Sequence, residues 1–157
     1  MCSLSTTDIK NIRDIWSIVC QNPEENGRTV VIRLFLDYPQ TRTYFKNFKN
    51  IDTEEGIKES RQVRQHGRRV VMLLSKVIEC LEDWDKTSTL LSELADRHQQ
   101  HHKVEVVNFK FLFAALNSVY IDVFGPTFTP DIEASWQKFY SLTYQQLEKC
   151  YSTCPSS

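Results

Sequence analysis

The sequence predicts one all-α domain of seven or eight helices, and three observations support this prediction. Apolar residues recur at intervals of three and four along most of the chain, a spacing that places them on one face of a helix. Only four glycines and five prolines occur among 157 residues, so few positions break a helix. No segment alternates apolar and polar residues for long, and strands are therefore not expected.

The first expected helix follows Ser5, a residue that favours the N-cap, and its inner face carries Ile9, Ile12, Trp16 and Val19.

A second helix is expected to start with Asn22 as its cap and Pro23 at its first position. It should end before Pro39, because proline restricts the residue that precedes it.

A long middle helix is expected from about Ser60 to Leu81. The stretch DKTST (85–89) is expected to break it, and the next helix should carry Leu90, Leu91, Leu94 and Ala95.

Two further helices complete the predicted fold. One runs from Val106 to Val123 and is closed by Gly125 and Pro126. The last begins with Thr129 as cap and Pro130 at the first position. Its inner stripe consists of Ile132, Trp136, Phe139, Leu147 and Cys150.

Two glycines lie inside expected helices, where glycine costs roughly 0.5–1 kcal/mol relative to alanine. Gly27 is in the second helix and Gly67 in the long middle helix. A close crossing of the two helices explains both residues. Two tolerated surface glycines are the alternative.

Composition limits the class of protein. The chain is 41% hydrophobic and 25% charged with a formal charge of -1, values typical of a soluble globular protein. This charge gives no reason to expect nucleic acid or an anionic membrane as partner. The start MCSLSTTD has no signal-peptide pattern, and no run of apolar residues is long enough to span a membrane, so we expect a cytoplasmic protein.

The five cysteines are scattered and form no Cys-x-x-Cys pair. We expect free thiols in a reducing cytoplasm rather than a zinc site or a disulfide framework. Oxidation of Cys150 and Cys154, within one chain or between two, is the alternative.

The histidines are the candidate functional residues. His98 continues the apolar stripe of Leu91 and Leu94, and His66 continues that of Val63, so both side chains should face inward. A single inward histidine is usually a core residue, but two on separate apolar helices favour metal or haem ligation.

The remaining two histidines, His101 and His102, fall near the expected end of a helix, where their charge is favourable without a metal. A zinc site formed by His98 and His101 is disfavoured, because the pair lacks the i, i+4 spacing and a suitable neighbouring ligand.

Four segments in this order, YPQTRTYFKNF, RQHGRRVV, LADRHQQHHKVEVVNFK and WQKFY, resemble the globin family. The segments YFKNFK and LEDWDK make the cytoglobin branch the most similar one. The resemblance covers about 5–151, so the chain (1–157) is expected to be a single globin domain with a haem pocket between its helices.

The resemblance implies a role for individual residues. His98 matches the proximal histidine that binds the haem iron, and His66 matches the distal histidine, which either hydrogen-bonds a bound ligand or is itself a sixth iron ligand. The expected cofactor is haem b held without covalent attachment, since no Cys-x-x-Cys-His occurs. The matching pocket residues are Val31, Phe45, Phe48, Val70, Leu94, Val104 and Phe109, and those near the propionates are Arg69, Arg97 and His102. For Arg69 an exposed, solvated position is the alternative.

The chain also departs from the cytoglobin pattern. Pro23 and Arg68 stand where that branch has its paired cysteines, so its internal disulfide is not expected here.

Three functions remain open from the sequence. The first is reversible binding of O2, CO or NO for storage, transport or sensing, in a monomer or weak homodimer. The second is redox catalysis, as a nitric oxide dioxygenase, nitrite reductase or peroxidase, with an external reductase because no nucleotide-binding fingerprint occurs. No residue is assigned a catalytic role. The third is a haem-free helical interaction module.

Overall fold

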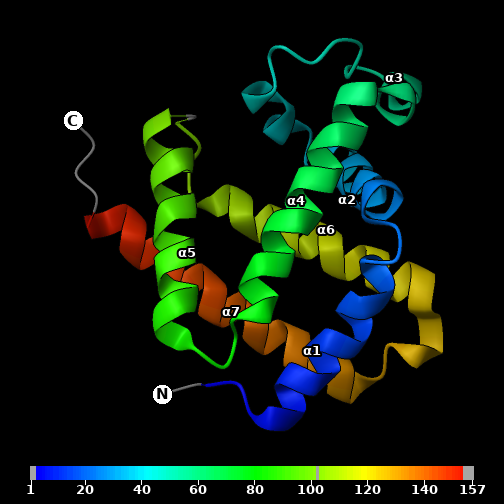
Figure 1. Cartoon of the computed structure of the whole chain (residues 1–157). Helices are drawn as coiled ribbons and strands as arrows, with labels where there is room; N and C mark the ends of the chain where they lie inside the picture. The colour runs from blue at the N-terminus through cyan, green and yellow to red at the C-terminus, as the bar shows by residue number, and fades with distance from the viewer. Residues whose placement is uncertain (1–2, 102, 154–157) are drawn as a thin grey trace.

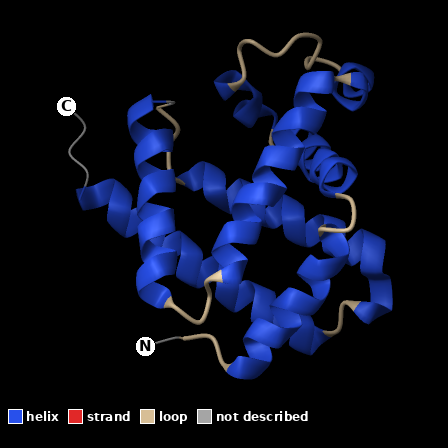
Figure 2. Ribbon diagram, in the orientation of Figure 1, coloured by secondary structure: helices blue, strands red, loops and turns tan. Residues whose placement is uncertain are grey.

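The computed structural model describes residues 3–101 and 103–153, which fold into helices joined by short connections (Figures 1 and 2). The described chain contains seven α-helices and no strand. They are α1 (Thr6–Val19), α2 (Pro23–Asp37), α3 (Glu54–Glu59), α4 (Arg61–Glu79), α5 (Trp84–Asp96), α6 (Val107–Phe124) and α7 (Pro130–Thr153). Three short segments accompany them: η1 (Pro39–Tyr44), the π-helical η2 (Arg97–His101) and η3 (Gly125–Thr127). The prediction of an all-α fold is confirmed.

Helices α1, α2, α4 and α7 start where the sequence predicts, because the cap residues make the expected hydrogen bonds. Ser5 and Asp8 form a capping box at α1. The Asn22 side chain accepts from the backbone N–H of Glu25 at 3.2 Å. At α4 and α7 the caps are Ser60, which accepts from the Val63 N–H at 3.2 Å, and Thr129, which accepts from the Ile132 N–H at 3.3 Å.

One boundary was predicted wrongly. Residues 85–89 do not break the chain but lie inside α5, and the break falls between Cys80 and Asp83. Asp83 caps α5 by accepting from the Lys86 N–H at 3.1 Å. The hydroxyl of buried Thr87 donates to the Cys80 carbonyl at 2.6 Å. Local hydrogen bonds from aspartate and threonine thus start this helix.

The core consists of two adjoining apolar clusters. The larger one joins α1, α4, α5, α6 and α7 around the fully buried rings of Trp136 and Phe139. The smaller one surrounds Val31 and Phe35 of α2. Leu112 of α6 packs against both clusters, so the predicted inner stripes meet in one continuous interior.

The helices α2 and α4 make the most extensive helix contact in the described chain, and it is centred on two glycines. A Cβ atom added at Gly27 would lie 2.1 Å from the carbonyl oxygen of Gly67, and one added at Gly67 would lie 2.3 Å from the carbonyl carbon of Gly27. Both residues are buried. The predicted close crossing is confirmed, and neither residue is a surface glycine.

One segment of the described chain, Val107–Thr127, is long and apolar enough to cross a membrane by length and composition alone. It consists of α6 and the short η3. Phe109, Phe113, Leu116 and Val119 of α6 are buried in the larger cluster. Burial in the core accounts for part of this apolar composition, whereas Val107, Ile121 and Val123 of α6 are exposed.

Candidate functional site

The two inward histidines lie on helices that run in opposite directions. Helices α4 and α5 are joined through Cys80–Asp83, so the first turns of α4 and the last turns of α5 lie toward the same end of the molecule, with α6 behind them (Figure 1). His66 belongs to the second turn of α4, and His98 follows the end of α5. Both side chains are half-buried.

His66 packs within a group of aromatic rings. The Phe45 ring lies 4.8 Å from the His66 ring, centroid to centroid, with an angle of 70° between the planes. Phe48 lies 6.2 Å from His66 and 5.1 Å from Phe45. The structure therefore brings together three of the predicted site residues from two separate segments.

The segment η1 positions Phe45. The Thr41 hydroxyl donates to the Tyr38 carbonyl at 2.7 Å, and Arg42 Nε donates to the Phe35 carbonyl at 2.9 Å. These bonds fasten η1 to the end of α2, and the Phe45 ring then packs 5.0 Å from that of Phe35.

Two predicted wall residues lie on the same helices. Val31 of α2 is fully buried in the smaller cluster beside Val63 of α4. Val70, one turn beyond His66, is half-buried against the larger cluster, which contains Leu94 and Phe109. Val31 and Val70 thus belong to the apolar packing of α4 and of α2, the helix that crosses it.

The hydrogen bond of His98 determines which ring nitrogen can bind a metal. Its Nδ1 lies 2.9 Å from the carbonyl oxygen of Leu94. A carbonyl only accepts, so Nδ1 of the neutral ring carries the proton and Nε2 carries the lone pair. This is the arrangement that orients a metal-binding histidine. The ring of Phe109, 5.1 Å away, packs beside it.

The segment after His98 is tied to the end of α7. The Val104 N–H donates to the His98 carbonyl at 2.8 Å, and the Tyr151 hydroxyl donates to the Val104 carbonyl at 2.7 Å. Gln99 Nε2 donates to the Tyr151 carbonyl at 3.2 Å. Burial, with smaller contributions from Tyr44 and Tyr144, raises the pKa of Tyr151 to about 12, so its hydroxyl stays protonated.

Gln99 and Tyr151 were not predicted as site residues. The available signal was weak: Tyr151 follows Leu147 by four positions and therefore continues the inner stripe of the last helix.

The predicted cationic residues lie outside this packed group. Arg69 and Arg97 are both exposed, and neither forms an ion pair with any residue that the structure describes. The third candidate, His102, lies outside the described residues.

The side chains suit axial ligation of a flat apolar macrocycle better than a closed metal site. Within residues 3–101 and 103–153, no three His, Cys, Asp or Glu side chains gather as metal ligands. A structural zinc site needs about four such ligands. A haem iron needs only one or two axial ligands from the protein and an apolar surround, and His98, His66 and their aromatic and aliphatic neighbours are side chains of these types.

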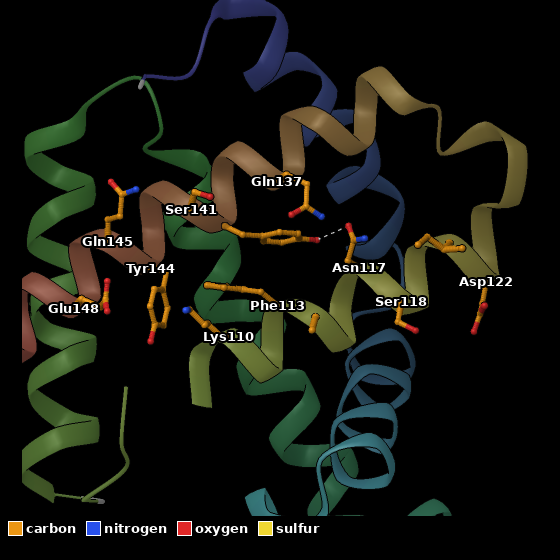
Figure 3. Close-up of a pocket in the computed structure, with 13 residues that line it drawn as sticks. Lys110, Phe113, Asn117, Ser118, Asp122, Gln137, Ser141, Tyr144, Gln145 and Glu148 are labelled. Carbon is orange, nitrogen blue, oxygen red and sulfur yellow. Dashed lines mark hydrogen bonds between the residues drawn. The ribbon is translucent and has the colours of Figure 1, made fainter. Parts of the chain in front are cut away.

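A separate surface groove of about 750 Å³ lies between α6 and α7 (Figure 3). Its lining includes Phe113, Tyr140 and Tyr144, and the Tyr140 hydroxyl donates to Asn117 Oδ1 at 3.2 Å. None of the predicted site residues lines this groove.

Comparisons with known proteins find similar chains over most of this sequence. The family model described as Globin matches residues 28–147. Cytoglobin-2 of Danio rerio is 32% identical over 148 residues, which cover 93% of this chain and 83% of that protein. Cytoglobin-2 of Oryzias latipes is also 32% identical, over 95% of this chain and 83% of its own length. Hemoglobin subunit alpha-D of Anas platyrhynchos is 36% identical over 94% of this chain and 99% of its own length.

Proposed function

The chain belongs to the globin family and resembles its cytoglobin members, and on this premise we propose that it holds one haem b through His98 and reversibly binds O2, CO and NO at the iron. The observation that carries the proposal is the hydrogen bond from His98 Nδ1 to the Leu94 carbonyl, which leaves Nε2 as the metal-binding atom. The bound haem would supply an iron that binds a diatomic gas.

The surroundings of the histidines fit this group. A haem needs apolar contacts on both faces, and Val31, Phe45, Phe48 and Val70 can supply them on the His66 side. Leu94, Val104 and Phe109 flank His98 on the other side.

The exposed arginines fit the outer edge of a haem. Arg69 and Arg97 form no ion pair with described residues and are assigned to the two propionates, together with His102. Guanidinium groups bind carboxylates through paired hydrogen bonds, which makes them suitable for this role.

His66 is proposed to control access of the gas. It can donate a hydrogen bond to the bound ligand, or its own nitrogen can occupy the sixth position until a gas displaces it. The similarity to cytoglobins favours the second arrangement. Such self-ligation lowers the apparent gas affinity by the fraction of open sites, about a hundredfold if a hundredth is open.

The chain would act in the cytoplasm, as a monomer or weak homodimer, with a separate reductase. Cys20 and Cys80 form no disulfide with another described cysteine, which is the usual state in a reducing compartment.

Absorbance spectra of the ferric, ferrous and CO-bound protein test haem binding directly. A Soret band that His98→Ala abolishes or severely weakens is expected, because the iron then loses its protein ligand. His101→Ala, which removes the same residue type three positions later, is the matched control and should retain the band. A normal Soret band in the His98 variant, with loss in the His101 variant, would refute the assignment.

The ferrous spectrum without gas distinguishes the two roles of His66. Sharp, split visible bands that His66→Leu converts to one broad band would establish ligation by both histidines. One broad band in the unmodified protein would restrict His66 to hydrogen bonding.

A further inference from the structure

The solvent-facing side of α4 carries a row of cationic and uncharged side chains that we call the α4 stripe. It consists of Arg61, Gln65, Arg68, Met72 and Lys76, all exposed, at successive spacings of four, three, four and four. This spacing places them in one line along the helix, about 22 Å long at 1.5 Å per residue. No other helix covers α4 on its near side in Figure 1.

Charge is strongly segregated on this helix. Residues 60–78 contain five cations and no carboxylate, although the whole chain has a formal charge of -1. The first carboxylate beyond Lys76 is Glu79, at the end of α4. The remainder of the chain therefore carries an excess of carboxylates.

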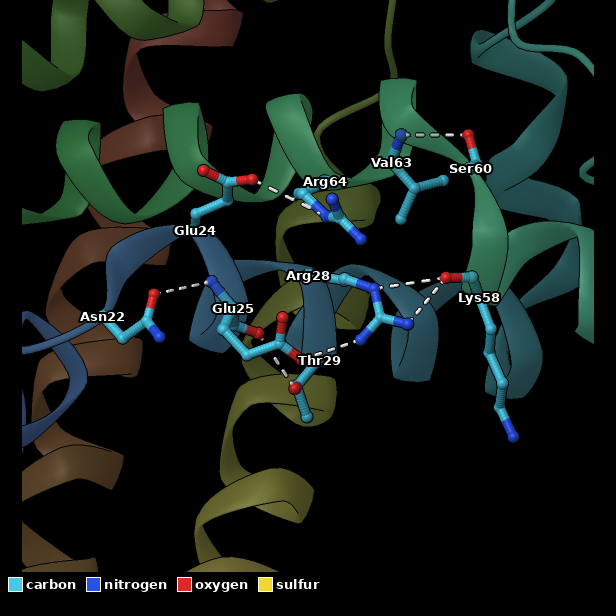
Figure 4. A network of polar contacts seen from close by, with 9 residues as sticks. All are labelled: Asn22, Glu24, Glu25, Arg28, Thr29, Lys58, Ser60, Val63 and Arg64. Atoms are coloured by element: carbon cyan, nitrogen blue, oxygen red, sulfur yellow. Dashed lines mark hydrogen bonds and ion pairs between the residues drawn. The ribbon is translucent and has the colours of Figure 1, made fainter.

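The cations beside α2 are neutralised, whereas those of the α4 stripe are not. Figure 4 shows Arg64 paired with Glu24, at 3.6 Å, and Arg28 paired with Glu25, at 2.8 Å. Arg61, Arg68 and Lys76 form no ion pair with any residue in the described part of the chain. Their charges are thus available to an anionic partner.

We propose that the α4 stripe docks an acidic electron-transfer protein that reduces this chain. The inference rests on the proposed haem function, which needs a ferrous iron and a source of electrons. With haem bound, one electron would pass from a reduced flavin or haem of the partner to the ferric iron and make it ferrous. The partner would be oxidised by one electron, and no covalent bond would form or break. The α4 stripe suits this role because it lies on the helix that also carries His66. The stripe and the site are therefore separated by about one helix diameter, 10 Å.

The chemistry of the α4 stripe favours an acidic protein over a lipid surface. Arginine and methionine are enriched at protein interfaces, and a line of about 22 Å fits the roughly 800 Å² that one partner contributes to a standard interface. Met72, at 46% exposure, is the single large apolar side chain of the α4 stripe, too little for insertion into a bilayer. The exposed carboxylates Glu54, Glu55 and Glu59 of α3 lie just before α4 and would be repelled by a flat anionic membrane.

Reduction kinetics provide the first test. Ferric protein is mixed under CO with reduced flavodoxin, an acidic one-electron donor that carries FMN, and formation of the CO-bound ferrous spectrum is followed by stopped flow. The bimolecular rate should fall at least about tenfold as the salt concentration rises from about 20 mM to about 300 mM, because steering between opposite charges is screened.

Two matched triple variants separate the α4 stripe from net charge. Arg61→Gln with Arg68→Gln and Lys76→Gln should lower the low-salt rate about fivefold or more and weaken its salt dependence. The control removes three exposed cations from α1, α5 and α6, through Lys10→Gln, Lys86→Gln and Lys110→Gln. It changes the net charge equally and should alter the rate less than about twofold.

The methionines provide a second readout that does not depend on turnover. The chain has two methionines, Met1 and Met72, so methyl-labelled protein gives a reporter within the α4 stripe, between Arg68 and Lys76. Adding oxidised flavodoxin to the CO-bound ferrous protein should shift the Met72 methyl resonance at low salt. The stripe variant should lose this shift, and the control variant should retain it.

The outcomes distinguish the docking proposal from the haem proposal. One outcome would refute docking on the α4 stripe and leave the haem proposal intact. In that outcome the protein takes up haem and CO, its Met72 resonance does not shift, and the two triple variants are reduced at equal rates. A Met72 shift with anionic vesicles or DNA but none with flavodoxin would also overturn it. A protein without a Soret band would refute the proposed function, while the Met72 shift, measured on that protein as isolated, would still report docking.

Discussion

The two histidines of the site are held by opposite means. On the His66 side, α4 is fixed by a backbone-to-backbone contact at Gly27 and Gly67, where no space remains for another atom. On the His98 side, hydrogen bonds from the end of α7 tie the segment after the histidine, through Tyr151, to the helical core. Added atoms should therefore damage the first region, and deleted polar atoms the second.

The largest expected effect comes from adding one carbon to the crossing. Gly67→Ala places a Cβ 2.3 Å from a backbone atom of Gly27, which cannot move aside as a side-chain end can. The free energy of unfolding should fall by roughly 3 kcal/mol, as measured by urea denaturation. The control Gln65→Ala, on the exposed face of α4, should change it by less than about 0.5 kcal/mol. Equal midpoints for the two variants would show that the crossing is not tight.

A polar tie between α1 and α7 should have a smaller, pH-dependent effect. Burial alone would raise the pKa of Asp8, but hydrogen bonds from the Ser5 backbone, Ser135 and Lys138 lower it from 3.8 to about 2. Because the folded pKa lies below the unfolded one, the stabilisation is complete above about pH 4 and is lost as the pH falls toward 2.

Asp8→Asn tests this tie. It should lower the free energy of unfolding by about 1.5 kcal/mol at pH 7, with allowance for solvent screening of Lys138. The difference from the unmodified protein should shrink toward zero near pH 2. A deficit that is independent of pH would show that shape, not charge, holds α1 to α7.

Removal of the Tyr151 hydroxyl tests the hydrogen bonds on the His98 side of the site. Tyr151→Phe deletes the donor to the Val104 carbonyl and should cost about 1 kcal/mol of unfolding free energy. It should also change the iron–histidine stretching frequency in resonance Raman spectra, since the segment that follows His98 is less restrained. Tyr44→Phe is the control, because that exposed hydroxyl only accepts a 3.4 Å hydrogen bond from Asn108. Identical frequencies in both variants would show that the Tyr151 hydroxyl does not influence the position of His98.

The smallest effect is expected for the thiols. Cys20 is exposed and Cys80 half-buried, and neither forms a disulfide with a cysteine that the structure describes. Replacing each with Ala should change the unfolding free energy by less than about 0.5 kcal/mol and leave haem uptake intact. Loss of folded protein on treatment with a reductant would contradict this expectation.

Much of the fold could be predicted because its signals are local. The caps Ser5, Asn22, Ser60 and Thr129 precede the helices that they start, and each makes its hydrogen bond within three residues. The failure at residues 85–89 has a local cause as well. The polar residues after Asp83 are typical of a loop. In the structure, however, the Thr87 hydroxyl donates to the carbonyls of Cys80 and Asp83 and thereby supports a helix.

The site was harder to predict than the fold. The inward positions of His66 and His98 follow from helical periodicity, and the aromatic partner Phe45 follows from the family resemblance. The hydrogen bond from Gln99 to Tyr151 joins residues 52 positions apart in the sequence, and the bond from Tyr151 to Val104 joins residues 47 positions apart. No periodic pattern within one helix contains such information, because it depends on where two helix ends meet in space.

The π-helical segment η2, which directly follows α5, gives the end of α5 an adjustable length. In a π turn the backbone bond spans one residue more than in an α turn, so the chain accommodates an additional residue without gaining a full turn. Upstream, Leu91 and Leu94 keep their α-helical register and remain buried in the core. Insertion or deletion of one residue after Gln99, at positions 100–101, can therefore be absorbed as a change between π and α winding, with His98 and Gln99 left in place. In evolutionary terms, η2 is the place where this chain can vary in length while the apolar face of α5 remains in register.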